Sequence, residues 1–428
     1  MLYRVVFVWG RPVAPDCFYD RQKELSAVLK QIALFSEGQK IDHIMIMARR
    51  RVGKTSFVDK VIADIEEQVK LTMNAPTIHT KLLFPVKVNC EGVLTTEDDA
   101  RCKNIKNFFD ALLNSTEKAY FDLRQPGSYN RYREALEGIG DKVENAFKKA
   151  FRGLTPTEIE SQIIPQILKI KWDYKSPNDW EEALLQLTKK TSVLFKRHIA
   201  FVFFIDEFGY LKHVEDTFWL RLRNTLQSQD CPFLFIVSGS QGLRQMNNPV
   251  VFREFRLKFG LDEEESKRLL EDGLKARNCQ IERDALTKLL DFTNCNAMYL
   301  QMSGDVLLNL GKKVISIRDI DEAIGTKGKT LVNPHLSAAF DSLWRKDILK
   351  YYPSPTLARK ILRIIASKQT IAKDTFASAL GNEDAEIVDE TISDLKDNFF
   401  IEQDDQNQLI FVDNAFRSWI NQNHPLEG

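Results

Sequence analysis

The segment Ala48-Arg49-Arg50-Arg51-Val52-Gly53-Lys54-Thr55 constrains the fold more than any other part of the chain. Its spacing is that of a phosphate-binding loop, with alanine at the first position. Such a loop wraps its backbone N–H groups around a phosphate and directs the N-terminus of the next helix at the same group. The apolar run 44–47 before it predicts a buried strand, and the apolar spacing over 54–69 predicts a helix. The segment therefore predicts an α/β fold with a parallel sheet.

The residue types of this loop indicate their chemistry. Lys54 is expected to contact the β- and γ-phosphates of ATP, and the hydroxyl of Thr55 is expected to bind Mg²⁺. A chance match in a basic turn is the alternative, and the strand–loop–helix context weighs against it. Ala48 replaces the commoner glycine, which is expected to tighten or strain the turn. The residues predicted to bind the nucleotide from this loop are Ala48, Arg51, Val52, Gly53, Lys54, Thr55 and Ser56.

Two adjacent acids follow a second apolar run. The β-branched and aromatic segment 199–205 predicts a buried strand, and Asp206 and Glu207 stand at its carboxyl end, where ligands of α/β sheets bind. Asp206 is expected to hold Mg²⁺ through water, and Glu207 to orient the attacking water. The alternative is a strand that ends in a solvated acidic turn.

The next apolar run, 232–237, ends in Ser238-Gly239-Ser240. A small polar residue at this edge can sense the γ-phosphate, and Ser240 is the candidate, with an ordinary turn as the alternative. Arg253 follows and is a candidate for stabilising transition-state charge, in cis or toward a neighbouring subunit. A solvated surface arginine is the competing interpretation.

The pattern along the chain predicts three parts. Residues 1–260 are expected to form the α/β core, with a helical insertion at 100–195. Residues 261–350 are expected to form a helical lid and a connecting helix, with a capping box of Asp262 and Glu265 at its start. Residues 351–428 are predicted to form helices followed by a hairpin with strands at 399–401 and 409–412.

Composition limits the remaining possibilities. The chain has 60 Lys+Arg and 60 Asp+Glu, which gives no overall attraction to nucleic acid or to an anionic membrane. Its six cysteines include no C-x-x-C pair, so neither a zinc site nor a disulfide framework is indicated. The longest apolar run, 199–205, is far shorter than a membrane helix, and the N-terminus lacks a signal-peptide core. A cytoplasmic protein is therefore expected.

These blocks together resemble the archaeal-type P-loop ATPases, a family near the AAA+ and STAND ATPases. The similar segments are Phe18 to Leu25, Arg49 to Ser56, Asp206-Glu207-Phe208, Ser238 to Ser240, and Phe252-Arg253. The resemblance implies ATP and Mg²⁺ as cofactors, places Arg21 near the nucleotide, and implies a C-terminal winged helix. The lid segment Asn294 to Ala297 departs from the family pattern, because it lacks the usual glycines and proline and offers no arginine.

The charge of the tail bears on its partner. Residues 354–428 contain seven Lys/Arg and thirteen Asp/Glu, and the expected recognition helix, 384–397, has Lys396 as its only base. DNA affinity depends on phosphate neutralisation, so this surface is expected to contact the ATPase or a protein partner.

The favoured hypothesis is an ATP-driven switch that controls a protein partner in regulation, signalling or defence, with a nucleotide-dependent oligomer possible. A DNA-remodelling or DNA-loading ATPase is the first alternative. A protein that keeps ATP as a structural ligand is the second.

Overall fold

The structure is a computed structural model of the 428-residue chain. It describes residues 21–49, 51–73, 81–90, 198–206, 231–239, 252–324, 334–348, 354–372 and 383–426, with a few isolated positions between these ranges. The predicted insertion at 100–195 lies almost entirely outside the described residues.

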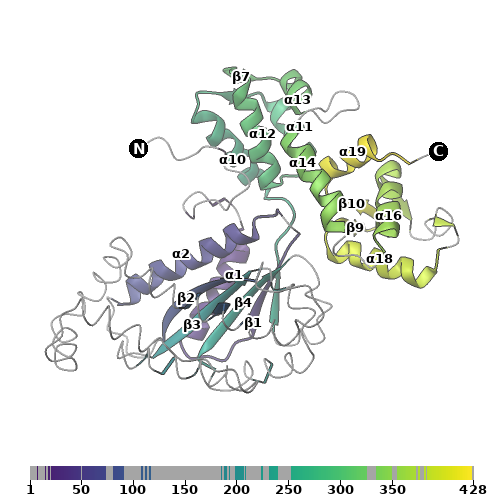
Figure 1. Ribbon diagram of the computed structural model, residues 1–428. Coiled ribbons are helices and arrows are strands. Elements are labelled where there is room, and N and C mark those ends of the chain that lie inside the picture. Colours follow the sequence, from purple (N-terminus) through teal and green to yellow (C-terminus); the bar gives the residue numbers. More distant parts are fainter. Residues whose placement is uncertain are drawn as a thin grey trace.

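Five strands form a wholly parallel sheet in the spatial order β2-β3-β4-β1-β5 (Figure 1). They are β1 (His43–Met47), β2 (Leu82–Asn89), β3 (Ile199–Asp206), β4 (Phe233–Gly239) and β5 (Phe252–Arg256). β1, β3 and β4 are buried along their whole length, which explains their nearly continuous apolar sequences. The edge strand β5 was not predicted, because its sequence Phe-Arg-Glu-Phe-Arg is largely polar and partly exposed. The predicted α/β fold with a parallel sheet is confirmed.

Two described helices of the core flank the sheet. They are α1 (Gln22–Ser36) and α2 (Lys54–Met73). α1 buries Leu25, Val28, Ile32 and Phe35, which recur at helical spacing as predicted. α2 begins directly at the end of the phosphate loop, so its positive N-terminus lies at the carboxyl edge of the sheet.

A group of helices follows the sheet, and we call it the lid. It contains α10 (Glu263–Lys275), α11 (Arg283–Thr293), α12 (Ala297–Asn309) and α13 (Ile317–Ile324), with the short parallel strands β6 (Gln280–Ile281) and β7 (Val314–Ile315). It lies above the sheet on the side of α2 (Figure 1). Asp262 is the N-cap of α10, but its side chain makes no capping hydrogen bond, so the predicted capping box is not formed from that side.

The unusual turn between α11 and α12 is built without glycine. Asn294 and Cys295 have φ angles of +46° and +56°, and asparagine tolerates this left-handed region better than most residues. Asn296 then caps α12, because its side-chain oxygen accepts hydrogen bonds from the N–H groups of Met298 and Tyr299 at 3.1 and 3.2 Å. The turn therefore forms without the glycines and proline that the resemblance implies at this position.

The chain then passes through α14 (Pro334–Ser342) and a π-helical turn, η6 (Leu343–Asp347), into the part that we call the tail. The tail contains α16 (Pro355–Lys368), β8 (Thr370–Ala372), α18 (Ala385–Asp397), β9 (Ile401–Gln403), β10 (Gln408–Phe411) and α19 (Asn414–Asn423). Its strands form an antiparallel sheet in the order β8-β10-β9. The hairpin was predicted, whereas β8 and α19 were not.

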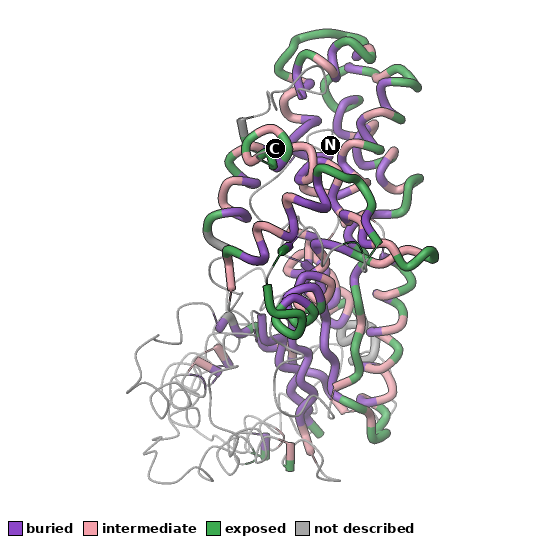
Figure 2. Tube along the Cα trace, turned by 90° about the vertical axis from the view of Figure 1, so that its right-hand side faces the viewer, coloured by how far each residue is buried: buried purple, intermediate pink, exposed green. Residues whose placement is uncertain are grey.

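Buried side chains connect these parts. Figure 2 shows buried segments in the sheet, the lid and the tail, and their apolar residues belong to one cluster. Near the N-terminus, Phe7 is buried against the lid, where two glycines make room for its ring. A Cβ added at Gly273 of α10 or at Gly304 of α12 would lie 2.3 Å from that ring. None of the helices in the described ranges is both long and apolar enough to cross a membrane.

Candidate nucleotide site

The candidate site lies where β1, β3 and β4 end at the carboxyl edge of the sheet. The loop between β1 and α2 contains Arg51 with a φ of +68° and Gly53 with a φ of +92°. A Cβ at Gly53 would meet no atom within 4 Å, so glycine is needed there for its backbone angle and not for space. Positive φ angles on both sides of Val52 turn successive N–H groups inward, and such an arrangement favours a bound anion.

The ammonium group of Lys54 is held by the loop itself. Its Nζ donates to the carbonyl oxygens of Ala48 at 3.0 Å and Arg49 at 3.3 Å. Lys54 is buried at the start of α2. The charge is thus fixed at a helix N-terminus, where a phosphate would meet both the lysine and the helix dipole.

Asp206 at the end of β3 accepts hydrogen bonds from two hydroxyl groups. Thr55 Oγ1 donates to Asp206 Oδ2 at 3.0 Å, and Ser238 Oγ donates to Asp206 Oδ1. The structure therefore brings together Thr55 and Asp206, as the sequence predicted, and adds Ser238 of β4. Two of the predicted catalytic residues, Glu207 and Ser240, lie outside the described residues.

These side chains fit a magnesium ion bound together with a nucleotide. Thr55 and Asp206 offer hard oxygen ligands on adjacent elements, and Mg²⁺ in phosphate-binding sites takes few protein ligands beside water and substrate oxygens. Within the described ranges, no three His, Cys, Asp or Glu side chains gather as a separate metal site. Any Mg²⁺ bound here would take its remaining ligands from water and phosphate.

Arg21 lies beside the loop, and its guanidinium group contacts backbone, so its place near a nucleotide stays a prediction. Nη2 donates to the carbonyl oxygens of Val52 at 3.3 Å and Lys258 at 2.9 Å. The side chain is buried, and its own φ is +65°. Arg21 thus connects the loop to the segment that enters the lid. Ser56 lies half-buried in the first turn of α2.

The structure does not place Arg253 beside Lys54, Thr55 and Asp206. It is exposed on β5 and pairs with Ile44 near the start of β1, whereas the loop follows Met47 at the other end of that strand. Its guanidinium lies 5.8 Å from the ring centre of Phe255. A role of Arg253 in charge stabilisation, in cis or toward a neighbouring subunit, stays a prediction.

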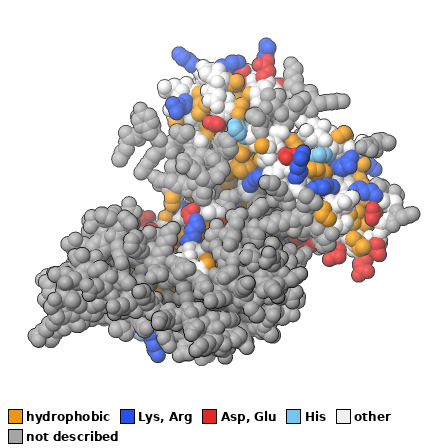
Figure 3. All heavy atoms as spheres, in the orientation of Figure 1, with side chains coloured by type: hydrophobic (Ala, Val, Ile, Leu, Met, Phe, Trp, Pro, Cys, Tyr) orange, Lys and Arg blue, Asp and Glu red, His pale blue; other side chains and the backbone are white. Residues whose placement is uncertain are grey.

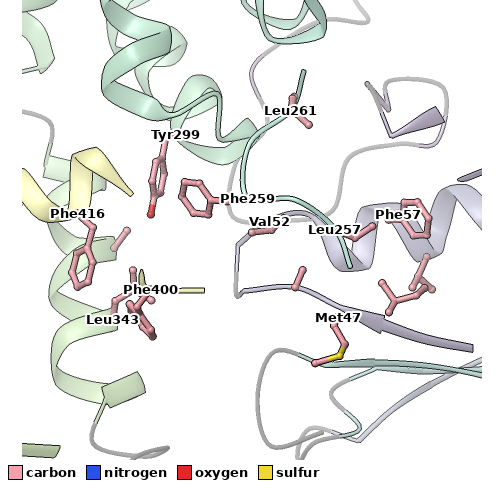
Figure 4. Close-up of a cluster of buried hydrophobic side chains, with 14 of the residues drawn as sticks. Met47, Val52, Phe57, Leu257, Phe259, Leu261, Tyr299, Leu343, Phe400 and Phe416 are labelled. Carbon is pink, nitrogen blue, oxygen red and sulfur yellow. The ribbon is translucent and has the colours of Figure 1, made fainter. Parts of the chain in front are cut away.

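The contacts made by Arg49 were not predicted by any sequence pattern. This loop side chain is only 3% exposed, and Nη1 lies 3.0 Å from Oδ2 of Asp413, which is fully buried in the tail. Its guanidinium also lies 4.6, 5.2 and 5.5 Å from the ring centres of Phe400, Phe259 and Phe416. Figure 4 shows these three rings where the lid, the tail and the loop meet.

Tyr299 of the lid completes this contact. Its hydroxyl donates to Asp413 Oδ2 at 2.8 Å. Burial, together with the charge of Asp413, raises the pKa of the Tyr299 hydroxyl well above its usual range, so the group remains a donor. Arg51 makes a parallel connection, because its Nη1 donates to the carbonyl oxygen of Ala339 in α14 at 2.5 Å.

The sheet order, the loop and the Thr55–Asp206 pair define a P-loop NTPase fold. Among solved structures, the chain is similar to the Walker-type ATPase PABY2304 of Pyrococcus abyssi. The TM-score is 0.59 at 15% identity, over 97% of this chain and 99% of that one. It is also similar to the Aeropyrum pernix ORC2 protein in ADPNP and ADP complexes, with a TM-score of 0.50 at 14% identity, over 97% and 96% of the two chains.

These likenesses cover the lid and the tail as well as the sheet, and at such identities they concern the fold alone. No protein-family model matches the chain, and no curated protein sequence matches it.

Proposed function

We propose that the chain is an ATPase that uses Mg²⁺-bound ATP to switch the arrangement of its lid and tail, and thereby controls a protein partner. The observation that carries the proposal is the hydrogen bond from Thr55 to Asp206, beside the buried ammonium of Lys54 at the start of α2. A hydroxyl, a carboxylate and a fixed cation at one sheet edge are what phosphoryl transfer needs for positioning and charge neutralisation.

Each residue has a part in this proposal. Lys54 would bind the β- and γ-phosphates, while Thr55 and Asp206 would hold Mg²⁺, whose charge offsets that of the phosphates. Ser238 fixes the carboxylate of Asp206 by its hydrogen bond. Glu207 is proposed to orient the attacking water, and Ser240 to sense the γ-phosphate.

The switch is supported by three side chains around the loop. Arg21 reaches the segment before the lid, Arg51 reaches α14, and Arg49 reaches the tail. A change at the phosphates would therefore be passed to the segment before the lid, to α14 and to the tail. We propose the division into a core at 1–260, a lid at 261–350 and a winged-helix-like tail at 351–428, in a cytoplasmic AAA+/STAND-related protein that can form nucleotide-dependent oligomers.

Two substitutions test the proposed enzyme. Lys54→Ala should abolish ATP binding measured by calorimetry, because it removes the cation that faces the phosphates. Glu207→Gln should bind ATP as the wild type does and lose hydrolysis by about 10²-fold or more. A Glu207→Gln protein that released phosphate at the wild-type rate would refute the catalytic assignment. Tight ATP binding by a wild type without turnover would favour a structural nucleotide.

The Glu207→Gln variant also tests whether the chain binds a protein partner in its ATP-bound state. When it is held with ATP, it should retain a protein that the Lys54→Ala variant does not retain. Mass spectrometry and nucleic-acid staining of the same sample would identify both kinds of partner. Retention of DNA alone, with DNA-stimulated turnover of the wild type, would favour the alternative function as a DNA-remodelling or DNA-loading ATPase.

The described surface of the tail supports a protein partner. Glu386, Asp389 and Glu390 are exposed on α18, and Figure 3 shows acidic side chains gathered at this end of the molecule. These charges would repel DNA phosphates. On α16, Arg359 and Arg363 already donate to backbone carbonyl groups at 2.6–3.1 Å, so their charges are partly engaged within the protein.

A further inference from the structure

Asp413 lies in the tail, and its carboxylate contacts residues of the tail, the lid and the phosphate loop. Oδ1 accepts from the N–H of Phe416 at 2.9 Å and so caps α19. Oδ2 accepts from the hydroxyl of Tyr299 in the lid and lies 3.0 Å from Nη1 of Arg49 in the phosphate loop. The side chain is fully buried, so all of these contacts are shielded from water.

Arg49 connects this carboxylate to the lysine of the loop. Its side chain points into the three rings of Phe259, Phe400 and Phe416, while its carbonyl oxygen accepts a hydrogen bond from Lys54 Nζ at 3.3 Å. The same residue therefore touches the tail through its guanidinium and the phosphate-binding ammonium through its backbone. Fixing the side chain of Arg49 restricts the position of that carbonyl, and with it one of the two groups that hold Lys54.

The charge of Asp413 is essential to this arrangement. Both terminal nitrogens of Arg49 are buried, and neither has a hydrogen-bond partner among the described residues, so the nearby carboxylate and the aromatic rings are what compensates the charge there. Removing one partner of a buried ion pair leaves the other charge uncompensated, which is strongly unfavourable. Without the carboxylate, Arg49 would leave the rings, and the tail would lose its hold on the loop.

We propose that Asp413 of the tail is a positioning residue for nucleotide binding, and that a docked tail keeps the phosphate loop in its binding conformation. The inference rests on the proposed function of that loop. A loop that is ordered before the nucleotide arrives loses less entropy on binding. By linkage, nucleotide binding must then stabilise tail docking by the same factor.

The experiment compares two substitutions of the same kind in the full chain. Asp413→Asn keeps the side-chain oxygen that caps α19 and removes the charge, since asparagine is an equally good cap. Asp384→Asn is the matched control, because Asp384 caps α18 in the tail through the N–H of Glu386 and is exposed, away from the loop. Affinity for a fluorescent ATP analogue should fall about tenfold in Asp413→Asn and stay unchanged in Asp384→Asn.

A second set of variants, made in an Arg49→Met protein, distinguishes the effect of the Arg49–Asp413 pair from that of a general loss of packing. In an Arg49→Met protein the buried cation is absent, so Asp413→Asn should weaken nucleotide binding no further. If Asp413→Asn does not fold, Tyr299→Phe gives the milder test. That variant loses one hydrogen bond to the carboxylate and keeps both charges, and it should weaken binding in the same direction by a smaller factor.

Hydrogen exchange without nucleotide distinguishes failure of this inference from failure of the proposed function. Amides 48–55 should exchange faster in Asp413→Asn than in Asp384→Asn. Equal exchange and equal nucleotide affinity in the two variants would overturn the inference. A wild type that binds no nucleotide would overturn the proposed function, and the exchange comparison would still decide whether Asp413 holds the loop.

Discussion

Asp206 illustrates at the scale of one residue how the site is assembled from separate elements. Its two carboxylate oxygens accept hydrogen bonds from Thr55 in α2 and Ser238 in β4. Each hydroxyl is placed by the element that carries it. The parallel strands β3 and β4 end at the same edge of the sheet, and α2 begins there. The carboxylate is therefore oriented by the fold, as a ligand or a positioning group must be.

A residue-scale prediction concerns the hydroxyl of Thr55. Thr55→Val keeps the shape of the side chain and removes the oxygen proposed to bind Mg²⁺, whereas Thr55→Ser keeps that oxygen. We expect Mg²⁺ to increase ATP affinity about tenfold or more in the wild type and in Thr55→Ser, and to have no such effect in Thr55→Val. Calorimetric titrations with Mg²⁺ and with a chelator check this, and a full Mg²⁺ effect in Thr55→Val would contradict the assignment.

Single residues also show where sequence reasoning reached its limit. Lys54, Thr55 and Asp206 could be singled out because their expected chemistry is tied to short motifs in a strand–loop or loop–helix context, and the structure places them at one edge of the sheet. The choice of Ser240 over Ser238 was a choice between two serines two positions apart, and it stays a prediction because Ser240 lies outside the described residues. Arg49 gave no signal, because its partner Asp413 lies in a different part of the chain.

At the scale of elements, α13 shows how a helix start is stabilised in the lid. Asp319 in its first turn accepts from the N–H and the hydroxyl of Ser316 at 2.9 and 2.8 Å, and it also pairs with Lys312. The hydrogen bond from Lys312, followed by that from the Ser316 N–H, lowers the pKa of Asp319 to about 2. Capping of this kind was expected at Asp262, whose side chain makes no capping hydrogen bond to α10.

This shift predicts a pH dependence of stability. The folded pKa of Asp319 is below the unfolded value, so its stabilisation is complete above the unfolded pKa of about 3.9 and is lost as the pH falls toward 2. The contribution is about 1 kcal/mol, because Lys312 is half-exposed and water screens the pair. Urea unfolding should show that Asp319→Asn is destabilised by this amount at pH 6.

Because the folded and unfolded pKa values bracket pH 3, the pH-dependent part of this difference should fall to roughly half there. Asp284→Asn, at an exposed position in the first turn of α11, serves as the control. A difference for Asp319→Asn that stayed constant from pH 6 to pH 3 would argue against the charge effect.

At the scale of the whole molecule, the ring of Phe7 packs against two helices of the lid that are distant from it in sequence. A Cβ at Gly304 would lie 2.3 Å from the Phe7 ring, so Gly304→Ala should displace that ring. In the wild-type background we expect a loss of about 1–3 kcal/mol from overpacking. In a Phe7→Ala background the same change should stabilise by up to about 1 kcal/mol, because alanine favours a helix interior over glycine.

Thermal unfolding of the four proteins in this cycle checks the prediction. The sign of the Gly304→Ala effect must reverse between the two backgrounds. The same loss in both backgrounds would mean that the Phe7 ring does not occupy the space beside Gly304.

The arrangement of the parts was the least predictable aspect of the fold. Hydrophobic period located most helices of the lid and the buried strands, since each of these patterns is local. The edge strand β5 was missed because it is polar, and the ten-residue helix α19 because its buried residues span only 415–420, which is a short periodic pattern. Docking of the tail against the loop depends on contacts between distant segments, and such contacts cannot be predicted from a local sequence pattern.

The Arg49–Asp413 contact also has a consequence for the order in which the protein can be completed during synthesis. Arg49 is translated long before its buried counter-charge Asp413, which lies 364 residues further along the chain. The neighbours of β1 in the sheet, β4 and β5, likewise come long after β1 itself. Since chains are made from the N-terminus and distant contacts must wait, the phosphate loop would reach its final form only after the much later translation of the tail.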